Sequence, residues 1–152
     1  MIRGRAIHNH MVMRLRRAAA DSGARVRVEA YLGPGLGYAD LVAELGALRV
    51  IVEAERAPRR ALNDLAKARA VGATHLVIAT PTASVAKSIR RRLRGARRAS
   101  DPRIIVRTQA KAEQALTWLF FRIPGAECRA DINATNSRPG QERDLSTIGG
   151  DA

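Results

Sequence analysis

The chain has 152 residues and a net charge of +13, from 27 lysines and arginines against 14 aspartates and glutamates. This length suits one domain, and a hydrophobic content of 46% is enough for a single core. The single cysteine, Cys128, excludes an internal disulfide and a cysteine-rich zinc knuckle. Without a secretory signal or an apolar run near the ~18–20 residues of a membrane span, we expect a cytoplasmic protein with no membrane contact.

The first third of the chain predicts a helix followed by a strand. Hydrophobic residues recur at helical spacing over 2–20, and Asp-Ser-Gly at 21–23 ends that helix. Residues 25–32 alternate strictly and therefore predict a strand. One face of this strand is expected to carry Val26, Val28, Ala30 and Leu32.

A β-hairpin is predicted next, after a glycine-rich turn at 33–37. The strands 38–45 and 48–55 are separated only by Gly46 and Ala47, which suits a tight type II′ turn.

The rest of the chain alternates helices with strands. Pro58 begins a helix over 58–71, with Gly72 as its C-cap. The elements expected after it are a strand at 74–80, a helix at 81–96, a strand at 103–109 and a helix at 111–121. Residues 123–152 are polar, glycine-rich and aperiodic, which predicts a flexible tail behind a single domain at 1–122.

The order of these elements is αβββαβαβα. Three antiparallel strands are followed by strands that helical crossovers reach, and such strands must be parallel. We therefore predict an α/β fold of three layers, α/β/α, around a mixed sheet of about five strands.

The hairpin gathers three acidic residues. If Leu45 opposes Leu48, then Glu44 faces Arg49 and Asp40 faces Glu53. Asp40, Glu53 and Glu55 then share one face, because side chains alternate along a strand. The opposite face is apolar and is expected to pack on a helix, with Leu41, Ala43, Val50, Val52 and Ala54.

Opposed carboxylates destabilise a sheet and raise one of the two pKa values. A divalent cation such as Mg²⁺ removes this cost, since it binds one or two carboxylates together with substrate phosphates. The alternatives are a slipped register, or neutralisation of the acids by Arg56 and Arg59.

At these residues the chain resembles the PD-(D/E)xK nuclease superfamily, which has the restriction-endonuclease-like fold. The resemblance covers about residues 2–94 by element order, with Tyr-Ala-Asp at 38–40 and Glu-Ala-Glu at 53–55 in the motif positions. It implies hydrolysis of DNA phosphodiesters with Mg²⁺ or Mn²⁺. The resemblance assigns the metal to Asp40, Glu53 and the backbone carbonyl of Ala54.

One departure from the motif matters for catalysis: Glu55 stands where the family has a lysine. Glu55 could bind a second metal ion. Alternatively Lys67 of the next helix supplies the missing cation; Asn63 lies four residues before it, on the same helical face. An ordinary solvated lysine at position 67 is the remaining alternative. The predicted catalytic residues are Asp40, Glu53, Glu55 and Lys67.

The basic residues point to nucleic acid, because a sequence pI near 11.5 over a whole domain attracts phosphate backbones. We expect the first helix and the helix over 82–94 to straddle the DNA and to position it without reading its sequence. The residues expected to contact DNA are Arg14, Arg16, Arg17, Arg59, Asn63, Lys87, Arg90, Arg91 and Arg94.

Two other motifs carry less weight. His8 and His10 of the His-Asn-His triplet point to different sides of a helix, so a shared metal site is not expected. Trp-Leu-Phe-Phe at 118–121 is expected to cap the core, with a homodimer contact as the alternative.

Three functions follow, in order of preference. The first is a metal-dependent DNA endonuclease, resolvase-like, that is structure-selective or weakly sequence-specific and acts on branched or nicked DNA. The second is a catalytically inactive DNA-binding module on the same fold. The third is a basic protein that docks on RNA or on an acidic protein surface.

Overall fold

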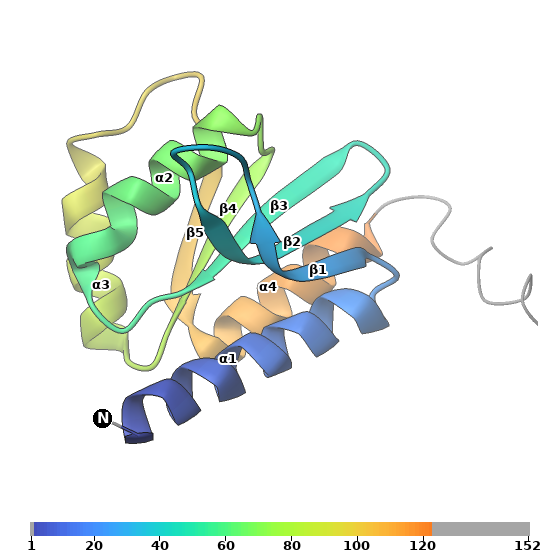
Figure 1. The fold of residues 1–152 in the computed structure, drawn as a ribbon, viewed down its shortest axis with the longest axis horizontal. Coiled ribbons are helices and arrows are strands. Elements are labelled where there is room, and N and C mark those ends of the chain that lie inside the picture. Colours follow the sequence, from blue (N-terminus) through green and yellow to red (C-terminus); the bar gives the residue numbers. More distant parts are fainter. Residues whose placement is uncertain (1, 123–152) are drawn as a thin grey trace, which may run out of the picture.

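The computed structural model describes residues 2–122 of the chain (Figure 1). Its elements are α1 (Ile2–Asp21), β1 (Arg25–Tyr31), β2 (Tyr38–Leu45), β3 (Leu48–Ala54), a 3₁₀ turn (Pro58–Arg60), α2 (Ala61–Ala70), β4 (His75–Thr80), α3 (Ala83–Arg94), β5 (Arg103–Thr108) and α4 (Gln109–Phe121). This order confirms the predicted one. The predicted tail at 123–152 lies outside the described residues.

The five strands form one mixed sheet in the order β1-β2-β3-β4-β5. Strands β1, β2 and β3 are antiparallel neighbours, whereas β4 and β5 run parallel to β3. The parallel strands follow α2 and α3, as the rule for helical crossovers requires. The carboxyl ends of β3, β4 and β5 therefore lie at one edge of the sheet.

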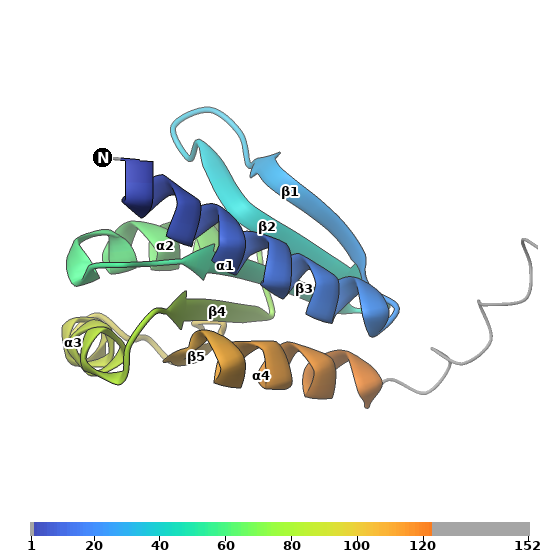
Figure 2. The same cartoon turned by 90° about the horizontal axis from the view of Figure 1, so that it is seen from below.

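Helices cover both faces of the sheet, which confirms the three-layer α/β/α fold (Figures 1 and 2). Helices α1 and α4 lie side by side on one face, where Leu15 and Phe120 are fully buried. Helices α2 and α3 cover the other face, where Leu65 and Ile89 are fully buried. As predicted, the apolar side of the hairpin joins the core under α1 and α4, with Leu41, Ala43, Val50, Val52 and Ala54.

The register of the hairpin is the predicted one. Leu45 pairs with Leu48, and Glu44 pairs with Arg49, whose Nε donates to Glu44 Oε1 at 2.8 Å. Gly46 has φ 56°, and Glu29 is the one non-glycine residue with positive φ among the described residues. A turn with positive φ at Gly46 but not at Ala47 agrees with type II′.

The prediction for β1 is wrong at Glu29. Val26 packs in the core under α1 and α4, whereas Ala30 and Leu32 pack in the core under α2 and α3. Val28 is 41% exposed. Because Glu29 has φ 45°, the strand turns over at this residue and its alternation changes face. The predicted single apolar face of residues 25–32 therefore does not exist.

Smaller differences concern the helix boundaries. The predicted helix over 58–71 begins as a 3₁₀ turn, and α2 itself starts at Ala61. Gly72 follows with φ 61°, and Ala73 N donates to Ala68 O at 2.9 Å, which is a glycine-capped helix end. In the part of the chain that the structure describes, no helix is long and apolar enough to span a membrane.

Candidate functional site

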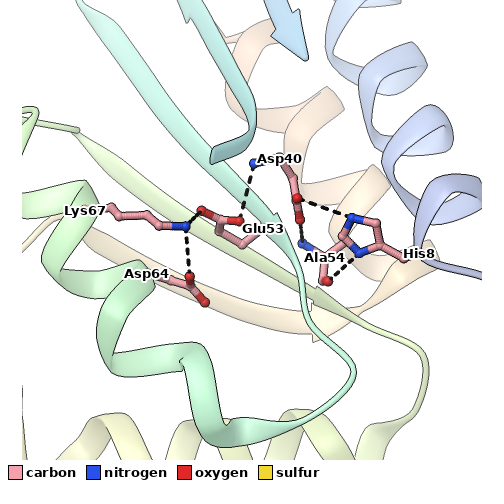
Figure 3. A network of polar contacts seen from close by, with 6 residues as sticks. All are labelled: His8, Asp40, Glu53, Ala54, Asp64 and Lys67. Carbon is pink, nitrogen blue, oxygen red and sulfur yellow. Dashed lines mark hydrogen bonds and ion pairs between the residues drawn. The ribbon is translucent and has the colours of Figure 1, made fainter. Parts of the chain in front are cut away.

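Two carboxylates meet where the pairing of β2 with β3 ends. The paired register stops at Leu41 and Val52, and beyond it Asp40 and Glu53 connect the strands through their side chains. Ala54 N donates to Asp40 Oδ2 at 2.8 Å, and Asp40 N donates to Glu53 Oε2 at 3.4 Å (Figure 3). Asp40 and Glu53 are thus neighbours as predicted, although a carboxylate replaces the backbone ladder between them.

The ladder between β1 and β2 is also interrupted at Asp40, opposite the bend at Glu29. In the register of β1 with β2, Val28 pairs with Leu41 and Ala30 pairs with Ala39. Glu29 and Asp40, which lie between these pairs, are not paired. Asp40 therefore lies at the one position in β2 where regular pairing is interrupted on both sides. Its side chain is free to hold the amide of Ala54.

His8 of α1 joins the cluster, which the sequence analysis did not anticipate. Its Nδ1 donates to the carbonyl oxygen of Ala54 at 3.1 Å, and its Nε2 lies 3.3 Å from Asp40 Oδ1 (Figure 3). Both partner atoms are acceptors, so the ring satisfies both when each nitrogen carries a proton. These two oxygens are also two of the metal ligands that the family resemblance implies.

A signal for His8 was present in the sequence. His8, Met11 and Leu15 follow helical spacing, and Met11 and Leu15 are buried against the sheet. His8 therefore lies on the inward face of α1, while His10 is exposed. This arrangement agrees with the prediction that the two histidines do not share a metal site, and it places His8 alone beside the acids.

Lys67 of α2 reaches the cluster from the other side. Its Nζ lies 3.0 Å from Glu53 Oε1 and 3.5 Å from Asp64 Oδ1 (Figure 3). Its side chain is 19% exposed, so it is not an ordinary solvated lysine. Asn63, its predicted companion, is exposed and does not line the site.

Asp64 is a fourth acid that sequence reasoning missed. It is 1% exposed, and its Oδ2 is the one buried side-chain polar atom in residues 4–122 without a hydrogen-bond partner. Its position three residues before Lys67, on the same helical face, was the available signal. The cluster therefore has more acceptor capacity than the described side chains satisfy.

The crowding of acids shifts their protonation. Burial, followed by the charges of Asp64 and Asp40, raises the pKa of Glu53 to about 8, although Lys67 favours the ionised form. Burial and the charge of Asp64 raise the pKa of Glu55 to about 7. Burial also raises the pKa of Asp64 to about 6, against the opposing effect of Lys67. The predicted repulsion between Asp40 and Glu53 is present, but desolvation is the larger cause.

A cavity of about 570 Å³ opens over the cluster. Its walls include Asp40, Glu53, Glu55 and Lys67, the four predicted catalytic residues, together with Tyr38. Its basic wall is formed by Arg5, Arg56, Arg59 and Arg60, of which only Arg59 was predicted to bind nucleic acid. Gly4 of α1 leaves the space that the guanidinium of Arg56 occupies.

The predicted metal ligands do not converge on one point. Among the described residues, no group of three or more histidine, cysteine, aspartate or glutamate side chains is arranged to hold a metal ion. Asp40 and the Ala54 carbonyl face His8, while Glu53 faces Lys67. The donor atoms still suit Mg²⁺ or Mn²⁺, because carboxylate and carbonyl oxygens are the ligands these ions prefer. The unpartnered oxygen of Asp64 is a further acceptor of the same kind, although Asp64 does not line the cavity.

The other predicted DNA-binding residues are dispersed. Arg14 forms an ion pair with Glu113 of α4 at 2.8 Å, and Arg17 lies 3.5 Å from Asp21. Arg16 is exposed on α1, and Lys87 and Arg91 are exposed on α3. Arg90 and Arg94 line a different hollow, beside β5. Of the predicted basic residues, Arg59 alone lies at the acidic cavity with Lys67.

Half of the segment at 118–121 is buried and half is exposed. Leu119 and Phe120 are buried and complete the core, as expected. Trp118 and Phe121 are exposed, so this half of the prediction is wrong.

No protein-family model, curated protein or solved structure matches the chain. The interpretation of the site therefore depends on its geometry and chemistry.

Proposed function

We propose that the protein is a metal-dependent DNA endonuclease that uses the acidic cavity as its active site. The observation that carries this proposal is the meeting of Asp40 and Glu53 with Lys67 in one cavity with four arginines. Buried acids with strongly raised pKa values in a cavity are typical of functional sites. The arginines supply charge for a phosphate, which is the group that a nuclease must bind.

Asp40, Glu53 and the carbonyl oxygen of Ala54 would hold the metal ion. Bound there, Mg²⁺ would supply Lewis-acid polarisation of a phosphodiester oxygen. His8 and Lys67 contact these ligand atoms, so metal binding requires that their nitrogen atoms move away from these oxygens.

Glu55 is suited to a proton transfer rather than to the function of the family lysine. Its pKa of about 7 lies near neutral pH, where a general base is most effective, and it lines the cavity. In the proposed reaction, water adds to phosphorus and gives its proton to Glu55. The phosphorus–oxygen bond to the leaving group breaks, and solvent protonates the leaving oxygen. Lys67, which lies beside Glu53, stabilises the negative charge that develops on the phosphate.

A cleavage assay tests the proposal. Supercoiled plasmid and a branched synthetic DNA are incubated with Mg²⁺, Mn²⁺ or a chelator. We expect metal-dependent cleavage that falls by at least about a hundredfold in Asp40→Asn and Glu53→Gln. Glu44→Gln is the matched control, because Glu44 lies on the same strand as Asp40 but pairs with Arg49 outside the cavity. Equal cleavage by Glu53→Gln and the wild type would contradict the proposal.

The second candidate is a DNA-binding module without catalysis. It is favoured by the contacts of His8 and Lys67 with the proposed metal-ligand oxygens, and by glutamate at the lysine position of the motif. Salt-sensitive DNA binding without cleavage in either metal, and without thermal stabilisation by Mg²⁺ or Mn²⁺, would establish this alternative.

A further inference from the structure

A second basic hollow follows the edge strand of the sheet. It has a volume of about 480 Å³ and lies along β5, the last strand, between α3 and α4. We name it the β5 groove. Its charged and aromatic lining residues are Arg90, Arg94, Arg97, Arg103, Arg107 and Trp118.

The β5 groove concentrates positive charge without compensation. No aspartate or glutamate lines it, and none of its five arginines forms an ion pair with a described residue. Like charges at short range repel, so the folded protein tolerates this cluster at some cost in stability. A polyanion that entered the groove would remove that cost and gain charge-assisted hydrogen bonds.

Trp118 adds a flat apolar surface to this charge. It is 51% exposed, although the chain has only five aromatic side chains to fill its core. The guanidinium of Arg122 lies over one face of its ring, 3.9 Å from the centroid, so a base would stack on this guanidinium or take its place on the ring. Arginines beside an exposed aromatic ring are the combination that binds single-stranded nucleic acid, because phosphates take the charges and a base stacks on the ring.

The edge of β5 disfavours two other occupants. Arg90 and Arg107 both donate to the carbonyl oxygen of Val106, at 2.9 and 3.1 Å. A peptide strand that extended the sheet would have to displace these bonds. A second copy of the chain docked groove to groove would bring five arginines against five. Charge and stacking therefore favour a single strand of nucleic acid over a protein partner.

The β5 groove also lies close to the acidic cavity. Ala54 of β3 pairs with Ala79 of β4, and Ala79 pairs with Arg107 of β5. Two strand spacings separate Ala54 from Arg107, which is about 10 Å across the sheet. A strand that leaves the cavity can reach the groove within a few nucleotides.

We infer that the β5 groove binds single-stranded DNA, with its phosphates on the arginines and a base on Trp118. The choice of DNA over RNA rests on the proposed function. The binding of a single strand in the groove is inferred from the groove alone. A site for a single strand beside a cleavage site would favour substrates with unpaired arms, such as branched or flapped DNA.

The sole tryptophan makes the inference directly measurable. The full chain with Glu53→Gln is titrated with oligo(dT) in a chelator at low salt, and Trp118 fluorescence is recorded. Since this variant needs no catalysis, failure of the cleavage assay does not affect the result. We expect quenching that saturates, because a stacked base contacts the indole ring. Anisotropy of a labelled oligonucleotide reports binding anywhere on the protein; binding without quenching would overturn the inference.

Arg94 and Arg92 provide a matched pair of charge reversals. Both are exposed on α3, but Arg94 lines the β5 groove and Arg92 does not. We expect Arg94→Glu to weaken oligo(dT) binding by about tenfold or more, and Arg92→Glu by less than about threefold. Trp118→Leu, followed by anisotropy, should weaken binding about tenfold.

Three further results would overturn the inference. Equal weakening by Arg92→Glu and Arg94→Glu would mean that a diffuse field, not the groove, binds the DNA. Tighter binding of oligo(rU) or of a duplex would exclude single-stranded DNA as the preferred occupant. Quenching by a polyglutamate peptide at lower concentrations than by oligo(dT) would identify an acidic protein as the better partner.

Discussion

Lys67 Nζ and Glu53 Oε1 lie 3.0 Å apart, so an ammonium from α2 meets a carboxylate from β3 inside the acidic cavity. The contact joins two residues that are 14 positions apart in the chain. It places a cation beside Glu53, whose Oε2 also accepts a hydrogen bond from the backbone amide of Asp40.

Removal of this ammonium should leave buried negative charge unbalanced. We expect Lys67→Met to lower the free energy of unfolding by roughly 2 kcal/mol, because Glu53 and Asp64 both lose their cation. Asn63→Met, an exposed position on the same helix, should change it by less than about 0.5 kcal/mol. Urea denaturation at pH 9 measures both, because Glu53, with a pKa of about 8, is mostly ionised at that pH.

The double variant Lys67→Met/Glu53→Gln checks the cause. It should recover part of the loss, since the uncompensated carboxylate is removed together with its partner. No recovery would mean that the packing of the Lys67 stem, not its charge, carries the effect.

The raised pKa values predict how stability depends on pH. Glu53, Glu55 and Asp64 have pKa values of about 8, 7 and 6 in the folded protein, against ordinary values of 4.5, 4.5 and 3.8. Between about pH 4.5 and pH 8 the folded state binds more protons than the unfolded chain, so stability falls as the pH rises. Each excess proton corresponds to about 1.4 kcal/mol per pH unit.

Urea denaturation at pH 5.5, 6.5, 7.5 and 8.5 measures this slope. Glu53→Gln should flatten it, because the group with the highest pKa no longer titrates. Stability that increases over the same range would show that these acids are ionised in the folded protein.

His8 and His10 offer a direct comparison within one helix. His8→Ala should destabilise the metal-free protein by about 1 kcal/mol, because the carbonyl of Ala54 and the carboxylate of Asp40 both lose a contact. His10→Ala, at an exposed position, should change stability by less than about 0.5 kcal/mol. Thermal unfolding in a chelator compares them; equal effects would argue against a specific contact of His8.

The backbone at Glu29 can be tested with glycine. Its φ of 45° lies in the left-handed region, where a Cβ atom is unfavourable. Glu29→Gly should therefore be more stable than Glu29→Ala by about 1 kcal/mol, and Glu29→Val should be the least stable of the three. An alanine variant as stable as the glycine variant would show that the strand relaxes out of this conformation.

Much of the fold is determined by local patterns in the sequence. Two residues between alternating strands allow only a tight turn, and that turn sets the pairing of Glu44 with Arg49. Helical crossovers then require that β4 and β5 run parallel to β3. Hence the order of the sheet and the meeting of Asp40 with Glu53 could be predicted without a structure.

Tertiary packing decided which other side chains join these acids. The positions of His8, Asp64 and Lys67 depend on how far α1 and α2 are shifted along the sheet, which their own periodicity does not specify. The turn of β1 at Glu29 was also hidden, because glutamate is not a residue that favours positive φ. Local sequence fixes the face on which a side chain lies, but contacts between distant elements fix its neighbours, and the chemistry of the cavity depends on those neighbours.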